Sequence, residues 1–137
     1  MGEGGAVAER KSVVLVVEDD IEMRHLLCDE LWSEGYQLRE AKDGDEALQN
    51  VMRAIPDLIL TDLRMPAGGP DYICRLRTVA PQCPIIVMTA FGDTKAKAEV
   101  MHAGATAYFD KPVRVAEIKR SMRSLLGDHP QVPSGPA

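Results

Sequence analysis

Short apolar runs alternate along this chain with longer stretches of helical periodicity, and this alternation restricts the fold more than any other feature. The apolar runs, each bounded by turn residues, predict strands at residues 12–17, 36–40, 57–61, 84–89 and 107–110. Strands separated by helices pair in parallel through right-handed crossovers. Strands buried on both faces read as continuous Val, Ile and Leu, as the first, third and fourth runs do. We therefore predict an α/β sandwich, with one five-stranded parallel sheet that is doubly wound in the flavodoxin-like manner.

Residues that start helices stand where the alternation requires them. Asp43 forms a capping-box pattern with Glu46, and Pro70 suits a first helical turn. Asp20 can cap the first helix, and Asp93 can cap the stretch that follows it. Apolar positions at helical spacing support two of the helices independently, and these positions are Met23, Leu27, Leu31, then Val115, Ile118, Met122 and Leu125.

Length and composition fit one folded body. The chain has 137 residues, of which 45% are hydrophobic and 27% charged, values typical of a single globular domain. Residues 1–10 and 127–137 are rich in Gly, Ala and Pro, so we predict disordered ends around a domain at 11–126. The sequence has no signal-peptide pattern and no apolar run near the ~20 residues of a membrane helix, so we expect a cytoplasmic protein. A net charge of -5 argues against direct nucleic-acid binding.

Polar side chains stand at the carboxyl ends of four predicted strands, the edge where an open parallel sheet places its ligand crevice. Carboxylates gathered there would repel one another, and their pKa values would rise unless a cation compensated. Mg2+ binds carboxylate oxygens and backbone carbonyls, so the pattern predicts a magnesium site. A metal beside a lysine and a threonine is typical of phosphoryl transfer, in which a strand-end aspartate can be the nucleophile. In chain order the residues are Glu18, Asp19, Asp20, Asp62, Thr89 and Lys111.

Four segments carry a resemblance to a known family. The stretches VLVVEDDIEMR, DLILTDLRMP, IIVMTAFGD and AGATAYFDKPV resemble, in order and in spacing, the receiver domain of bacterial two-component response regulators. Each motif alone is weak, but the combination is specific and covers nearly the whole folded body. One segment departs from the family pattern, because AGGP replaces the usual short loop with Asp-Gly and is one residue shorter.

The resemblance implies a role for each residue at the strand ends. Asp62 would accept a phosphoryl group from the phosphohistidine of a histidine kinase, and Lys111 and Thr89 would contact the phosphate. The protein would then be a phosphoacceptor switch that assists its own phosphorylation and dephosphorylation, not an enzyme in the ordinary sense. The implied ligands of Mg2+ (or Mn2+) are Glu18, Asp19, Asp62 and the backbone carbonyl of Arg64.

The resemblance also implies how the signal leaves the site. Tyr108 matches the switch aromatic of the family, which turns inward when Thr89 moves toward the phosphate. The surface of the fourth helix, fifth strand and fifth helix (94–104, 107–110 and 115–126) would then change shape to bind a dimer partner, an effector or an output domain. Pro112 matches a position where the family has a cis peptide. The expected upstream partner is a sensor histidine kinase or a phosphotransfer protein.

Other interpretations of the same residues remain open. Asp62 could cap a helix, Tyr108 could be half-buried packing, and Arg64 and Phe91 could either flank the phosphate or be plain loop residues. A pseudo-receiver is a binding module of this fold that has lost one of the site residues, and none is lost here. A phosphatase of the haloacid dehalogenase type requires Asp-x-Asp at its nucleophile, where this chain has Asp-Leu-Arg. A flavin or dinucleotide binder would need a glycine-rich or Ser/Thr-rich phosphate loop after the first strand.

Overall fold

Strands and helices alternate throughout the part of the chain that the structure describes. The computed structural model describes residues 10–90 and 94–127. Within those two ranges, every helix is too short or too polar to span a bilayer. The elements in chain order are β1 (Val13–Val17), α2 (Ile21–Ser33), β2 (Gln37–Ala41), α3 (Gly44–Arg53), β3 (Leu58–Asp62), α4 (Pro70–Val79), β4 (Ile85–Thr89), α5 (Thr94–Ala103), β5 (Ala107–Asp110) and α6 (Val115–Leu126).

The five strands form one parallel sheet in the order β2-β1-β3-β4-β5. β2 lies on one side of β1 and β3 on the other, so the switch in strand order falls between β1 and β3. The register pairs Val17 with Thr61 and Asp62 with Met88, which brings the carboxyl ends of β1, β3 and β4 to one edge. The predicted doubly wound, five-stranded fold is confirmed.

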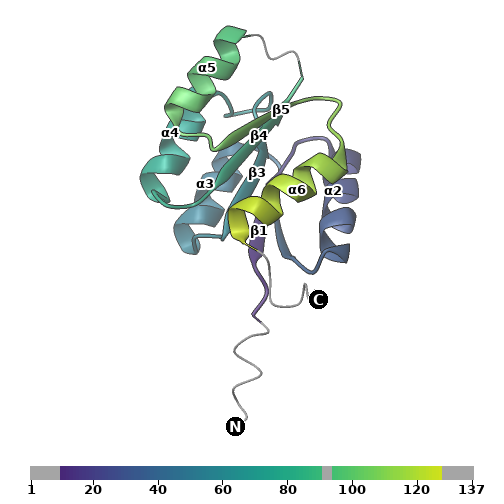
Figure 1. The fold of residues 1–137 in the computed structure, drawn as a ribbon. Helices are drawn as coiled ribbons and strands as arrows, with labels where there is room; N and C mark the ends of the chain where they lie inside the picture. The colour runs from purple at the N-terminus through teal and green to yellow at the C-terminus, as the bar shows by residue number, and fades with distance from the viewer. Residues whose placement is uncertain (1–9, 91–93, 128–137) are drawn as a thin grey trace.

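Helices cover both faces of this sheet (Figure 1). α2 and α6 pack on one face, and α3, α4 and α5 pack on the other. Successive side chains of β1 alternate between the two, because Val14 and Val16 join the core under α2 and α6 whereas Leu15 and Val17 join the opposite core. All residues of β3 and β4 are buried. Burial on both faces is the physical reason for the continuous apolar runs in the sequence.

Three of the predicted helix starts agree with the structure. Asp20 caps α2, because its carboxylate accepts bonds of 3.0 and 3.1 Å from two backbone N–H groups of the first turn. Asp43 caps α3 by accepting a 2.8 Å bond from the N–H of Glu46. Pro70 is the first residue of α4. Asp93 lies outside the described residues, as does most of both predicted disordered ends.

The loop between β3 and α4 packs against the start of α3. The N–H of Gly44 donates a 3.0 Å bond to the carbonyl of Pro66. A Cβ atom at Gly44 would collide with the carbonyl of Ala67, so this close approach requires glycine. Ala67 and Gly69 have φ angles of 60° and 99°, which turn the chain sharply into α4. The short AGGP segment is therefore held in place by α3.

Arg77 on α4 ties together two turns at the opposite edge of the sheet, where β4 and β5 begin. Its Nη1 donates bonds of 3.0, 3.1 and 2.7 Å to the carbonyls of Ala80, Pro81 and Cys83. Its Nε and Nη2 donate bonds of 3.2 and 2.7 Å to the carbonyl of Gly104, which ends the α5 segment. One guanidinium thus fixes the end of α5 relative to the end of α4.

We expect Arg77→Met to lower the free energy of unfolding by about 2–3 kcal/mol, because several partly buried carbonyls lose a charged donor. Arg75→Met is the matched control, since Arg75 lies on the same helix with an exposed side chain. Urea unfolding followed by circular dichroism measures both variants. Equal losses in the two would contradict the role assigned to Arg77.

Candidate functional site

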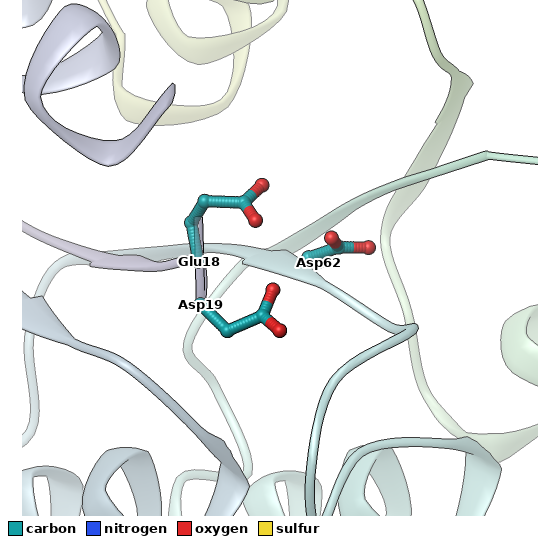
Figure 2. A group of neighbouring side chains, drawn as sticks. All are labelled: Glu18, Asp19 and Asp62. Atoms are coloured by element: carbon teal, nitrogen blue, oxygen red, sulfur yellow. The ribbon is translucent and has the colours of Figure 1, made fainter. Parts of the chain in front are cut away.

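Three carboxylates meet at the switch in strand order. Glu18 and Asp19 follow β1 directly, and Asp62 ends β3, the neighbouring strand. Each offers a carboxylate oxygen, and these oxygens lie within 4.8 Å of one another. Figure 2 shows the side chains of Glu18 and Asp19 directed toward the side on which Asp62 lies. Glu18 is 1% exposed and Asp62 4% exposed, whereas Asp19 faces solvent.

Lys111 supplies the positive charge of the site. Its Nζ donates bonds of 2.7 Å to Glu18 Oε1 and 2.9 Å to Asp62 Oδ2. The loop after β5 brings it there, because the N–H of Lys111 bonds the carbonyl of Thr89 at 2.9 Å. The peptide between Lys111 and Pro112 is cis, as the resemblance implied. One lysine is therefore shared by two buried carboxylates on different strands.

The pKa values of Glu18 and Lys111 are both shifted because these groups are buried together and hydrogen-bonded to each other. Burial raises the pKa of Glu18 above its ordinary value, and the negative charge of Asp62 raises it further. The bonds from Lys111 and from the N–H of Asp20 lower it, but they do not cancel the effect of burial. Burial alone would lower the pKa of Lys111, but its bonds to Glu18 and Asp62 outweigh that and raise it. Three carboxylates with one lysine leave an excess of negative charge.

The two oxygens of Asp62 have different partners. Oδ1 accepts bonds from the backbone N–H groups of Leu63 at 2.6 Å and Arg64 at 3.1 Å. Oδ2 accepts the bond from Lys111. A flexible side chain therefore holds one oxygen and the main chain holds the other. The side chain of Arg64 is exposed, and Phe91 lies outside the described residues.

Thr89 and Tyr108 lie on the same face of the sheet. Tyr108 is paired with Val87, two residues before Thr89 on β4, so all three side chains point the same way. Thr89 is buried, and its hydroxyl donates a long 3.4 Å bond to the carbonyl of Ala90. Tyr108 is half-buried against the core under α3, α4 and α5, and Lys97 Nζ lies 5.7 Å from the centre of its ring. The register thus makes Thr89 and Tyr108 diagonal neighbours on this face of the sheet.

The carboxylate cluster fits a hard divalent cation. Mg2+ binds oxygen ligands at about 2.1 Å and keeps several waters, so a few convergent carboxylates beside solvent suffice. Glu18, Asp19 and Asp62 supply such oxygens, and the exposure of Asp19 leaves room for water. The donor set contains neither sulfur nor imidazole, which argues against zinc.

Two hydroxyl groups near Asp62 were not singled out in the sequence. Thr61 precedes Asp62 on β3, and its Oγ1 lies 2.9 Å from the hydroxyl of Tyr72 on α4. Thr61 also donates a 2.7 Å bond to the carbonyl of Asp62. A threonine at the end of an otherwise aliphatic run is the sequence signal that could have drawn attention to this pair.

An apolar cavity of about 670 Å3 adjoins the carboxylates between the start of α2 and the loop after β5. Lys111 forms part of its wall, so the cavity opens onto the site. Its size is that of a typical small-molecule or side-chain site. The lining residues are Asp20, Met23, Leu26, Ala90, Lys111, Pro112 and Val113.

Comparisons of the sequence with known proteins point to one family. The family model described as the response regulator receiver domain matches residues 14–123. The transcriptional regulatory protein PhoP of Escherichia coli O157:H7 is 37% identical over 114 residues, which are 82% of this chain and 51% of that protein. The sporulation initiation phosphotransferase F of Bacillus subtilis is 32% identical over 114 residues, 82% of this chain and 92% of that protein.

Solved structures show the same fold. A receiver domain of a Francisella response regulator has a TM-score of 0.79 and 27% identity, covering 85% of this chain and 97% of its own. A CheY-like receiver domain protein from Methanospirillum hungatei has a TM-score of 0.83 at 23% identity, covering 89% and 98% of the two chains. The chain spans about half the length of most of the curated relatives it matches, the phosphotransferase excepted.

We expect Lys111→Met to lower the free energy of unfolding at pH 7, without divalent metal, by about 1–3 kcal/mol, because it leaves Glu18 and Asp62 buried without a counter-charge. Without the lysine, the pKa of Glu18 in the folded state rises further, because the bond and charge of Lys111 no longer oppose the effect of burial. A carboxyl with a raised folded pKa loses stability as pH rises, so the deficit of the variant should shrink between pH 7 and pH 5.

Unfolding curves at several pH values measure this dependence. Lys119→Met is the control, because Lys119 bonds Glu30 and Glu34 on the surface between α6 and α2. A deficit of Lys111→Met that stayed constant or grew toward pH 5 would contradict the assignment.

Proposed function

This chain belongs to the response regulator receiver domain family, and on that basis we propose that it is a phosphorylation-controlled switch whose acceptor is Asp62. Receiver domains act in two-component phosphorelays, so the relatives imply a histidine kinase or a phosphotransfer protein as donor. The observation that carries the proposal is the sharing of Lys111 between Glu18 and Asp62 at the switch in strand order. We assign the receiver to residues 11–126, which enclose the matched range.

The different partners of the two Asp62 oxygens support Oδ2 as the nucleophile. Oδ2 attacks the phosphorus of the donor, and the new O–P bond forms as the P–N bond to the donor imidazole breaks. The electron pair stays on that nitrogen, and because the other ring nitrogen carries a proton, the imidazole leaves as a neutral ring. Lys111 then moves from Oδ2 to a phosphate oxygen, a short displacement for a flexible side chain. Oδ1 keeps its bonds from the N–H groups of Leu63 and Arg64 throughout.

Glu18, Asp19, Asp62 and the backbone carbonyl of Arg64 are the proposed ligands of Mg2+. When bound, the ion supplies positive charge at the phosphoryl oxygens, which carry the negative charge of the transition state. Glu18 is fixed by Lys111 and by the N–H of Asp20 at 3.1 Å, so it keeps its orientation before the ion arrives. Solvent-exposed Asp19 is free to adjust to the ion.

The apolar cavity gives the donor a place to dock. Its wall includes Met23 and Leu26 of α2, and Leu26 is 52% exposed, so apolar surface is accessible to a partner there. A helical donor that carries the phosphohistidine could place its apolar side chains there. The phosphorus would then reach Asp62 past Lys111, which belongs to the same wall.

Thr89 and Tyr108 are the proposed switch. A phosphate on Asp62 adds a charge of about -2 and attracts the Thr89 hydroxyl, whose present bond to the Ala90 carbonyl is long and easily exchanged. Tyr108 would follow into the space that Thr89 leaves. The surface of α5, β5 and α6 would change with it and bind a dimer partner, an effector or an output domain. Arg77 and buried Val100 hold the carboxyl end of α5, whereas the first turn of this helix is mostly exposed and has fewer contacts that keep it in one position.

The competing functions fit the site less well. A pseudo-receiver would lack at least one of the acceptor, the acidic pair, the threonine or the lysine, and here all of them converge. A phosphatase of the haloacid dehalogenase type would need an acid two residues after its nucleophile. That position is Arg64, whose side chain is exposed.

We expect acetyl phosphate with Mg2+ to phosphorylate Asp62, and EDTA to prevent it. Asp62→Asn should abolish the hydroxylamine-sensitive adduct seen by intact-protein mass spectrometry, because the amide is a poor nucleophile. Asp19→Asn should raise the Mg2+ concentration needed for half-maximal labelling by at least about tenfold, the usual cost of a lost metal contact. Asp29→Asn on α2 is the control. An adduct that persists in Asp62→Asn would place the acceptor elsewhere.

We expect Thr89→Ala to accept phosphate at Asp62 yet lose the response at Tyr108, because the hydroxyl that links the two is gone. Hydrogen exchange of α5 and β5, with and without the phosphate mimic beryllofluoride, measures that response. Thr78→Ala is the control, since its hydroxyl bonds the carbonyl of Cys74 within α4. Equal changes in wild type and Thr89→Ala would rule out this route.

A further inference from the structure

Two hydroxyl groups lie fully buried in the core behind Asp62. Thr61 is 0% exposed and Tyr72 is 2% exposed, and their oxygens are 2.9 Å apart. Thr61 comes from β3 and Tyr72 from α4, so the contact joins the strand that carries Asp62 to the helix beside it. The core around them is apolar, where two aliphatic or aromatic side chains would pack without any need for hydrogen bonds.

The hydrogen bonds of this pair can run in one direction only. A threonine hydroxyl has a single proton, and that of Thr61 points to the carbonyl of Asp62 at 2.7 Å. The proton between the two hydroxyls must therefore come from Tyr72. Burial raises the pKa of Tyr72, so its hydroxyl keeps the proton it donates.

The same chain of bonds continues to the acceptor carboxylate. The carbonyl of Asp62 and the N–H of Leu63 belong to one peptide group, and this N–H donates the 2.6 Å bond to Asp62 Oδ1. A donor on the carbonyl side polarises the peptide and strengthens the bond that its N–H donates. The chain of hydrogen bonds therefore runs from the Tyr72 hydroxyl to the Thr61 hydroxyl, from there to the Asp62–Leu63 peptide group, and from that peptide to Asp62 Oδ1.

We propose that Tyr72 and Thr61 are positioning residues for phosphoryl transfer, which hold Asp62 Oδ1 on the main chain so that Oδ2 stays directed at the donor. The inference rests on the proposed function of Asp62. Neither hydroxyl touches the reacting atoms, and both act through the Asp62–Leu63 peptide. α4 thereby contributes to the geometry of a site that its own residues never enter.

The double variant Thr61→Val with Tyr72→Phe separates positioning from stability. Replacing both hydroxyls by apolar groups of similar shape leaves neither hydroxyl unpaired and removes one bond to the Asp62 carbonyl, so the free energy of unfolding should fall by only about 1 kcal/mol. The rate of labelling by acetyl phosphate at saturating Mg2+ should fall about fivefold, the effect of one ordinary hydrogen bond on a rate. A purely structural role would leave that rate unchanged.

Three single variants complete the series. Thr61→Ser keeps the hydroxyl and should keep the wild-type rate, whereas Tyr72→Phe should lower it even if the double variant fails to fold. Tyr36→Phe is the matched control, because Tyr36 is equally buried but packs in the core under α2 and α6. Its rate should equal that of the wild type.

The amide proton of Leu63 gives a second readout that needs no phosphate. Its NMR resonance should move upfield in Tyr72→Phe and further in the double variant, because the bond to Oδ1 weakens. A wild-type rate in the double variant, or an unmoved Leu63 resonance, would overturn the proposal. If wild-type protein took no phosphate at Asp62, the proposed function would fail instead, and the Leu63 resonance would still decide whether the hydrogen-bond chain exists.

Discussion

The burial of two like charges at the ends of neighbouring strands is the constraint on which the rest of the site depends. Burying Glu18 and Asp62 so close together costs free energy unless positive charge reaches both of them. Lys111 reaches them because the sheet is parallel and β5 ends at the same edge as β1 and β3. The negative charge that one lysine leaves uncompensated favours a divalent cation at this edge, and this is the physical basis of the proposed magnesium site.

Much of the fold and the identity of the clustered residues could be predicted because both follow from order along the chain. Alternating strands and helices determine a parallel sheet, and a parallel sheet brings its strand ends together, so Glu18, Asp62 and Lys111 had to be neighbours. Strand bounds were right to within one residue at each end. The single-residue shift of β3 matters most, since it makes Asp62 the last residue of the strand and leaves its oxygens between the main chain and Lys111.

Contacts that depend on side-chain packing between elements could not be read from the sequence. Tyr72 meets Thr61 only because of the rotation of α4 over β3, which no periodicity specifies. The five bonds of Arg77 depend likewise on where two turns end in space. In each case the sequence shows an ordinary helical residue, and the partner is a backbone carbonyl or a hydroxyl whose position is set by the completed fold.

The bonds from Arg77 to Gly104 fix the carboxyl end of α5, so that this end can act as a pivot for the helix. The helix is fixed at its carboxyl end by this guanidinium and by buried Val100, whereas the side chains of Thr94, Lys95 and Lys97 at its other end are exposed. A displacement of α5 would therefore be a rotation about its carboxyl end, and the movement would be larger at its amino end. A protein that docks on this face would then respond to a change in the tilt of α5 more than to a sideways shift of the helix.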